Sequence, residues 1–289
     1  MRRPRLSRRT FLAGGTGLAS TAIAGCLGLG ESPDGEQTAT PSRGEHQFDD
    51  ASPISSVETT ATELVVSLRD DADVSEVNLI APDGTAFARN SVVTGETAVR
   101  IPIVDPGARR FDENHYTPGE YTVVSVTEER SYRTPIQLSP KLRIVDVRPT
   151  YDDERSVATG NLAVDVENIG SAPTWVFQVV YDGAPYPEAN SGLADYTHIP
   201  ELSSPDDTVD TIIAPGETST FVGFRRPLQF LNEGESECTY DPVAFQMTIG
   251  TGLGSNPVAN VRATVSGDVR SRWNYNICSD VSVEFEEVR

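Results

Sequence analysis

Residues 161–170, Asn-Leu-Ala-Val-Asp-Val-Glu-Asn-Ile-Gly, decide the fold class of this chain. Leu162, Val164 and Val166 occupy every second position, and the run closes on Asn-Ile-Gly, a turn sequence. A period of two places these apolar side chains on one face of an extended strand, and β-branched valine suits that conformation. The stretch therefore predicts a strand that is buried on one face and runs into a turn.

Runs of the same kind recur on both sides of this strand. Turn sequences such as Pro82-Asp83-Gly84-Thr85 separate them, and Pro102 indicates an edge strand because proline has no backbone N–H to donate. No amphipathic helical window of useful length follows residue 47, so we predict an all-β fold. The expected strands cover residues 63–68, 77–80, 99–104, 121–126, 133–138, 142–149, 161–168, 176–183, 244–249, 258–265 and 281–288, and the stretch 213–221 carries a turn at 215–218.

Two antiparallel β-sandwiches are predicted, with a boundary at Ser139-Pro140: one over residues 48–140 and one over 141–289. Phrases such as Pro118-Gly119-Glu120-Tyr121-Thr122-Val123 resemble those of immunoglobulin-like or fibronectin-like extracellular modules. Residues 142–224 resemble the CARDB-type Ig-like domain, with V-x-V-x-N-x-G at 164–170 and P-G-E-T at 215–218. The resemblance implies an Ig-like fold and no functional residues. The chain departs from it at the proline-rich insertion 186–210 and in the extra strands after Phe224.

The N-terminal residues carry signals for export. Ser7-Arg8-Arg9-Thr10-Phe11-Leu12 resembles a twin-arginine (Tat) signal, and Ile23-Ala24-Gly25-Cys26 resembles a lipobox. The apolar run 11–25 is shorter than the roughly 20 residues that a transmembrane helix needs. The resemblance implies a signal peptide over 1–25, a lipid on Cys26, a flexible tether over 26–47, and a protein held on the extracellular side of the cell membrane. The alternative is an uncleaved N-terminal helix with an incidental cysteine.

The chain is strongly acidic, with a net charge of −20, and Lys141 is its single lysine. Removing the first 25 residues, which hold five arginines and no acid, shifts the net charge from −20 to −25. This balance argues against nucleic-acid binding. It resembles the composition of halophilic archaeal proteins, and together with the N-terminal signals it looks like a haloarchaeal surface lipoprotein. The alternative is an acidic mesophilic surface protein. We expect folding to depend on molar salt, with sodium and potassium equivalent.

Cys238 and Cys278 form an even pair once Cys26 is assigned to the lipid, so an exported chain is expected to join them in a disulfide. A loop of about 40 residues closed this way stabilises by roughly 4 kcal/mol on the chain-entropy model. The alternative is two free buried thiols.

No motif for catalysis, cofactor or metal is found, and we expect none of the three. His46, His115 and His198 lie far apart, and Cys278 lacks the neighbouring His and Met of a blue-copper loop. Carboxylate clusters occur at 49–50, 70–73, 152–154 and 206–210, as an acidic chain produces by chance; those at 70–73 and 206–210 are the best calcium candidates.

The insertion after Tyr186 is the most promising binding segment. We expect Tyr186, Tyr196 and His198 to project from the second sandwich as a binding loop. The alternative is a flap that covers a sheet edge. The sequence thus predicts a non-catalytic binding or structural module of the cell envelope, with an unknown protein or envelope partner. The other readings are an accessory subunit of a membrane complex, a calcium-dependent adhesion protein, or a hydrolytic enzyme with an unrecognised carboxylate site.

Overall fold

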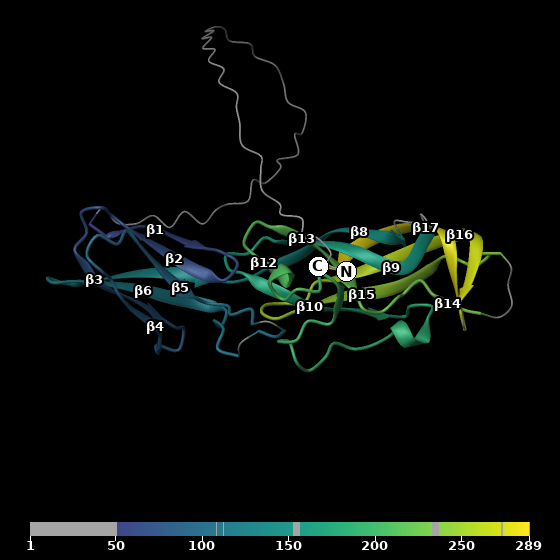
Figure 1. The fold of residues 1–289 in the computed structure, drawn as a ribbon, viewed down its shortest axis with the longest axis horizontal. Helices are drawn as coiled ribbons and strands as arrows, with labels where there is room; N and C mark the ends of the chain where they lie inside the picture. The colour runs from purple at the N-terminus through teal and green to yellow at the C-terminus, as the bar shows by residue number, and fades with distance from the viewer. Residues whose placement is uncertain are drawn as a thin grey trace, which may run out of the picture. The chain divides into compact units, whose positions relative to one another are not determined.

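The computed structural model describes residues 51–107, 109–111, 113–152, 157–232, 237–272 and 274–288. Apart from two short 3-10 helices, the regular structure of these residues is β, which confirms the predicted fold class (Figure 1). None of the described helices has the length and apolar character to cross a membrane. Arg8, Arg9, Cys26, His46 and the predicted tether lie outside the described residues.

The first seven strands form two antiparallel sheets, ordered β1-β2-β5 and β4-β3-β6-β7. Buried side chains from both sheets, such as Leu64 of β2 and Val123 of β6, share one core, so the arrangement is a sandwich. β5 lies at a sheet edge and contains Pro102, as predicted. The strands are β1 Ile54–Thr59, β2 Glu63–Leu68, β3 Val74–Ile80, β4 Ala86–Ser91, β5 Ala98–Pro102, β6 Gly119–Thr127 and β7 Ser131–Leu138.

The remaining elements form a second sandwich of two sheets, ordered β12-β10-β15-β16-β17-β14 and β11-β13-β9-β8. Val164 of β9 and Met247 of β15 meet in its core. The elements are β8 Leu142–Asp152, β9 Val157–Asn168, β10 Thr174–Asp182, η1 Pro187–Ala189, β11 Leu202–Ser204, η2 Val209–Thr211, β12 Ile212–Ile213, β13 Thr218–Gly223, β14 Phe230–Leu231, β15 Val243–Thr251, β16 Val258–Arg272 and β17 Tyr275–Val288.

Trp175 joins the core of the first sandwich although it belongs to β10. Its fully buried indole stacks 4.2 Å from the ring of Phe111, and its Nε1 donates a hydrogen bond of 2.7 Å to the backbone oxygen of Thr197. Tyr116 donates a 2.6 Å hydrogen bond to the backbone oxygen of Pro173. The sheets therefore separate at about residue 140, whereas the apolar core continues across that point.

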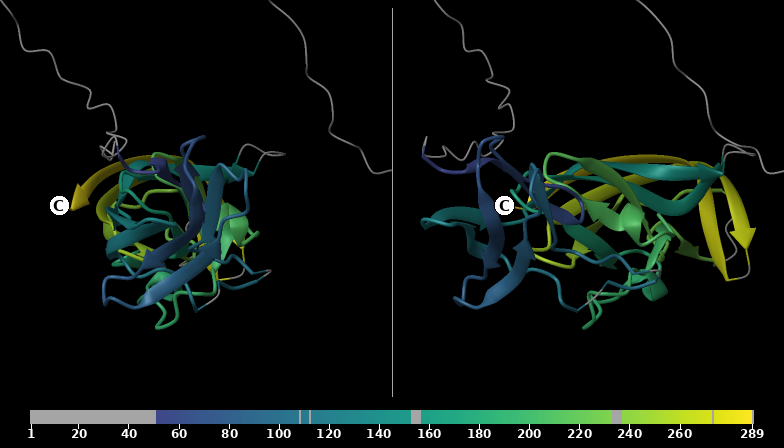
Figure 2. Two further views of the ribbon diagram at one scale, coloured as in Figure 1. Left: turned by 90° about the vertical axis from the view of Figure 1, so that its left-hand side faces the viewer. Right: turned by 60° about the vertical axis from the view of Figure 1, so that its left-hand side comes forward.

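The β16–β17 hairpin bends sharply before its tip (Figure 2). Pairing shifts register between Ser266 and Val269, and Gly267 has a φ of +85°. A β carbon at Gly267 would overlap the side chains of Ser279 and Asp280, so glycine alone fits this bulge. The bend places the tip of the hairpin beside β14, whose Leu231 pairs with Tyr275.

Candidate functional site

A pocket of about 360 Å³ opens where three segments meet, and we call it the Tyr186 pocket. The first segment is η1 and the residues that lead into it from β10. The second is the connection from β13 to β14, and the third is the first residue of β17. The lining residues are Tyr186, Glu188, Ala189, Phe224, Arg225, Arg226, Gln229 and Tyr275.

Asn190 shapes the first segment. Its side-chain oxygen accepts a 2.8 Å hydrogen bond from the backbone N–H of Ala184, and its Nδ2 donates to the backbone oxygens of Ala184 and Tyr186 at 3.0 and 3.2 Å. These bonds close a tight loop, which turns the side chain of Tyr186 toward the protein. The side chain of Asn190 therefore makes the hydrogen bonds that backbone groups make in an ordinary turn.

The prediction that Tyr186 projects from the sandwich is wrong. Its side chain is buried, with 8% exposure, and its ring lies 5.8 Å from that of Tyr275 in an edge-to-face arrangement. A phenol ring gains more by covering apolar surface than by extending into water. Burial and the nearby Glu188 carboxylate raise the pKa of Tyr186, so its hydroxyl stays protonated at neutral pH.

The connection from β13 to β14 is anchored at one end and exposed at the other. Leu228 is buried, and its N–H donates a 3.0 Å hydrogen bond to the backbone oxygen of Gly160. Gly160 has a φ of +82°, and a β carbon there would lie 3.3 Å from the backbone oxygen of Leu228. Phe224, by contrast, is 66% exposed, and the guanidinium of Arg225 lies 5.8 Å from its ring centroid. This end of the segment faces the solvent.

Arg225 and Arg226 are the cations of the pocket. Neither forms a salt bridge with any described residue, whereas the four salt bridges found among those residues use other arginines. This segment was not predicted from the sequence. Its signal was Phe-Arg-Arg, an aromatic residue followed by two adjacent arginines in a chain whose net charge is −20. Such a combination marks a surface suited to anions.

Gln229 completes the polar lining. The residue is only 4% exposed, yet it lines the pocket, and its side-chain amide forms no hydrogen bond with the described residues. The amide atoms of Gln229 are not among the side-chain polar atoms that are both buried and unpaired, so they reach the solvent in the pocket. An amide that faces a pocket without a protein partner is available to a ligand.

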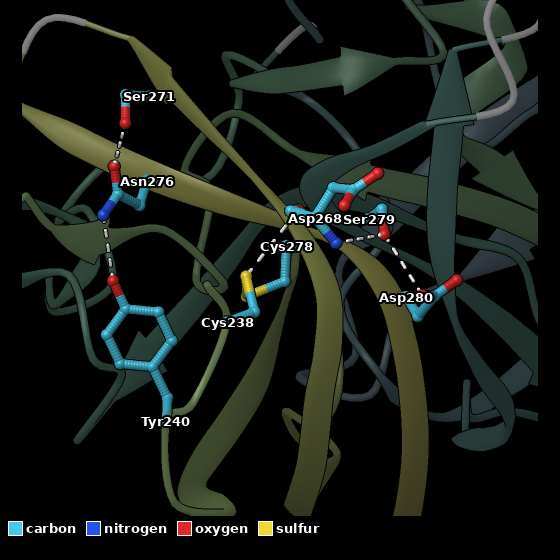
Figure 3. Close-up of a disulfide and its surroundings, with 8 residues drawn as sticks. All are labelled: Cys238, Tyr240, Asp268, Ser271, Asn276, Cys278, Ser279 and Asp280. Carbon is cyan, nitrogen blue, oxygen red and sulfur yellow. Dashed lines mark hydrogen bonds between the residues drawn. A yellow bond between two sulfur atoms is a disulfide. The ribbon is translucent and has the colours of Figure 1, made fainter. Parts of the chain in front are cut away.

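A disulfide fixes the frame behind the pocket. Cys238 and Cys278 are joined as predicted, with Cα atoms 5.7 Å apart (Figure 3). Beside the bond, the fully buried Asn276 donates to the hydroxyl of Tyr240 at 3.0 Å and accepts from Ser271 at 2.7 Å. The Tyr240 ring in turn stacks 4.1 Å from Phe230 of β14.

These contacts hold β14 and the start of β17 against one another. Gln229 directly precedes β14 and Tyr275 begins β17, so the positions of these two lining residues depend on the disulfide and the contacts beside it.

The rest of the predicted binding loop covers the free edge of β10. Glu201 donates a 2.6 Å backbone hydrogen bond to the oxygen of Phe177, and the side-chain oxygen of Gln178 accepts from the N–H of Ala194 at 2.9 Å. Tyr196 is 40% exposed and donates its hydroxyl proton to Glu201, and this hydrogen bond raises its pKa. His198 is half-buried. This part matches the flap alternative, and Tyr196 and His198 do not line the Tyr186 pocket.

The carboxylate cluster at 206–210 includes a residue with an ordinary structural role. Asp207 accepts a 3.2 Å hydrogen bond from the N–H of Val209 at the start of η2. No three of the described His, Cys, Asp and Glu side chains gather closely enough to hold a metal ion. Asp49, Asp50, Asp153 and Glu154 lie outside the described residues.

No protein-family model matches the chain, and no curated protein matches it. Among solved structures, the chain matches part of a β-glucuronidase from glycoside hydrolase family 2. The match covers 74% of this chain and 19% of the other, at 10% identity and a TM-score of 0.21. The chain thus spans about a fifth of that protein, and a likeness at this level transfers no activity.

Proposed function

We propose that the protein is a lipid-anchored surface protein that binds a component of the cell envelope through the Tyr186 pocket. The Tat-like and lipobox-like sequences ending at Cys26 support export and anchoring. The observation that carries the binding role is the pocket itself. It combines an exposed aromatic ring, two arginines without ion pairs among the described residues, and an unpaired amide on an ordered β framework. A binding site of this kind acts by contact, without a chemical step.

Anchoring is tested with the Cys26→Ser variant expressed in the native host. We expect the variant to appear in the medium or as an unprocessed precursor, because the serine hydroxyl cannot accept the thioether lipid. Replacing Arg8 and Arg9 by lysines should block export, because the translocation receptor reads the arginine pair. A Cys26→Ser protein that remains in the membrane at the normal mature mass contradicts the anchor.

Binding is tested by co-sedimentation of the purified Cys26→Ser chain, which lacks the lipid, with isolated host envelopes. Phe224→Ala removes the 66% exposed ring at the pocket mouth and should lower the bound fraction several-fold. Val93→Ala is the matched control: Val93 is 72% exposed, between β4 and β5, and does not line the pocket. Equal loss in the two variants, or no loss in either, removes the pocket from the proposal.

A further inference from the structure

We propose that the Tyr186 pocket recognises a saccharide that carries carboxylate groups, with Arg225 and Arg226 binding the carboxylate. This inference rests on the proposed function, because it names the ligand class of the same pocket. Three properties of the lining support it: the charge of the arginines, the hydrogen-bonding capacity of the polar side chains, and the exposed aromatic surface.

The charge of the pocket favours an anion. Arg225 and Arg226 lie next to each other in a strongly acidic chain, and no described carboxylate forms a salt bridge with them. A guanidinium offers its N–H donors in a flat fork that matches the two oxygens of a carboxylate. Among the described residues of the lining, Glu188 is the one acid. The Glu188 carboxylate repels a compact dianion such as phosphate, because both charges of so small an ion would lie inside the pocket.

The polar side chains favour a ligand with several hydroxyl groups. The amide of Gln229 has both a donor and an acceptor, and neither is used within the described protein. Glu188 accepts hydrogen bonds without donating. Hydroxyl groups donate and accept at one oxygen, so a sugar ring can satisfy both side chains at once, whereas an alkyl carboxylate can accept from the Gln229 amide but has no donor for Glu188.

The aromatic side chains supply an apolar surface for one face of a sugar ring. Phe224 is exposed at the mouth, and Tyr275 stands half-buried beside Tyr186. The volume of about 360 Å³ lies at the lower end of the range for small-molecule sites, which suits one or two sugar units of a longer chain. A unit of about 13 non-hydrogen atoms at a typical ligand efficiency binds with a dissociation constant on the order of 1 mM.

The experiment measures binding of trigalacturonate to the purified full chain by isothermal titration calorimetry. The methyl ester of trigalacturonate is the matched probe, because it keeps the sugar rings and hydroxyls and removes the charge. We expect the acid to bind at least about tenfold more tightly than the ester, the factor that loss of one charge-assisted hydrogen bond produces. Equal affinity for the two probes would overturn the proposal.

The variants Arg225→Gln and Arg226→Gln should each weaken binding of the acid by about tenfold or more. Arg89→Gln is the control. Arg89 is an exposed arginine on β4 that does not line the pocket, so its substitution removes the same charge elsewhere on the surface. Unchanged melting temperatures show that the variants fold. A loss in Arg89→Gln equal to that in the pocket variants would mean that general charge attracts the acid, and would also refute the assignment.

Inorganic phosphate and tetraglutamate serve as competing anions under the same conditions. Tighter binding of either than of trigalacturonate contradicts the saccharide assignment. The two proposals fail separately: if Phe224→Ala still abolishes envelope binding while trigalacturonate does not bind, the binding function stands and only the ligand class is wrong.

Discussion

Adding a single methyl group at Gly252 should lower the stability of the fold substantially. A β carbon at Gly252 would overlap the Cδ2, Cε2 and Cζ2 atoms of the Trp175 indole. The indole has no room to retreat, because it stacks 4.2 Å from Phe111 and its Nε1 is hydrogen-bonded to Thr197. The backbone of Gly252 is also held, since its N–H donates a 2.9 Å hydrogen bond to the oxygen of Trp175.

We therefore expect Gly252→Ala to lower the free energy of unfolding by about 3 kcal/mol, the upper end of typical overpacking costs. For a chain of this size, that loss lowers the melting temperature by roughly 6–12 °C. The assay is thermal unfolding of the full chain in molar salt, followed by circular dichroism.

Gly192→Ala is the control, because an ideal β carbon at Gly192 has no heavy atom within 4 Å, and it should change stability by less than about 0.5 kcal/mol. Trp175→Phe supplies a smaller ring, so the double variant with Gly252→Ala should be more stable than the sum of the two single effects predicts. The reasoning is refuted if Gly252→Ala melts within about 2 °C of the wild type, or if the two substitutions add without coupling.

The remaining predictions concern the disulfide and one carboxylate. Reducing the Cys238–Cys278 bond, which closes a separation of 40 residues, should cost about 4 kcal/mol and lower the melting temperature by roughly 8–16 °C; an unchanged melt with reductant would show that the bond adds nothing. Burial raises the pKa of Asp165, but hydrogen bonds from Arg148 and Thr220 outweigh burial and bring it below the usual 3.8. A lowered folded-state pKa contributes stability above about pH 4 that is lost as the pH falls through the folded value, so Asp165→Asn should show a shallower loss of stability in acid than the wild type; parallel acid limbs in the two proteins contradict this.

The fold class followed from the sequence because alternation is a local property. The apolar face of residues 161–168 depends only on the geometry of an extended chain, and β9 occupies Val157–Asn168. Pro102 indicated an edge strand for an equally local reason, the missing N–H donor. The disulfide could be predicted because the lipobox resemblance assigned Cys26 to a lipid, which left one pair of cysteines, and that pair is joined.

Tertiary structure alone decided which side chains form the pocket. Tyr186, Arg226 and Tyr275 lie far apart in the sequence. The pairing of β14 with β17 brings the segments of Arg226 and Tyr275 together, and the ring of Tyr186 packs against that of Tyr275. Strand periodicity says which face of a strand is buried, but not which distant loop covers it. For this reason Tyr186, expected in solvent, is buried, and Trp175 of β10 joins the core of the strands before residue 140. Long-range packing, which no single stretch of sequence contains, fixes both.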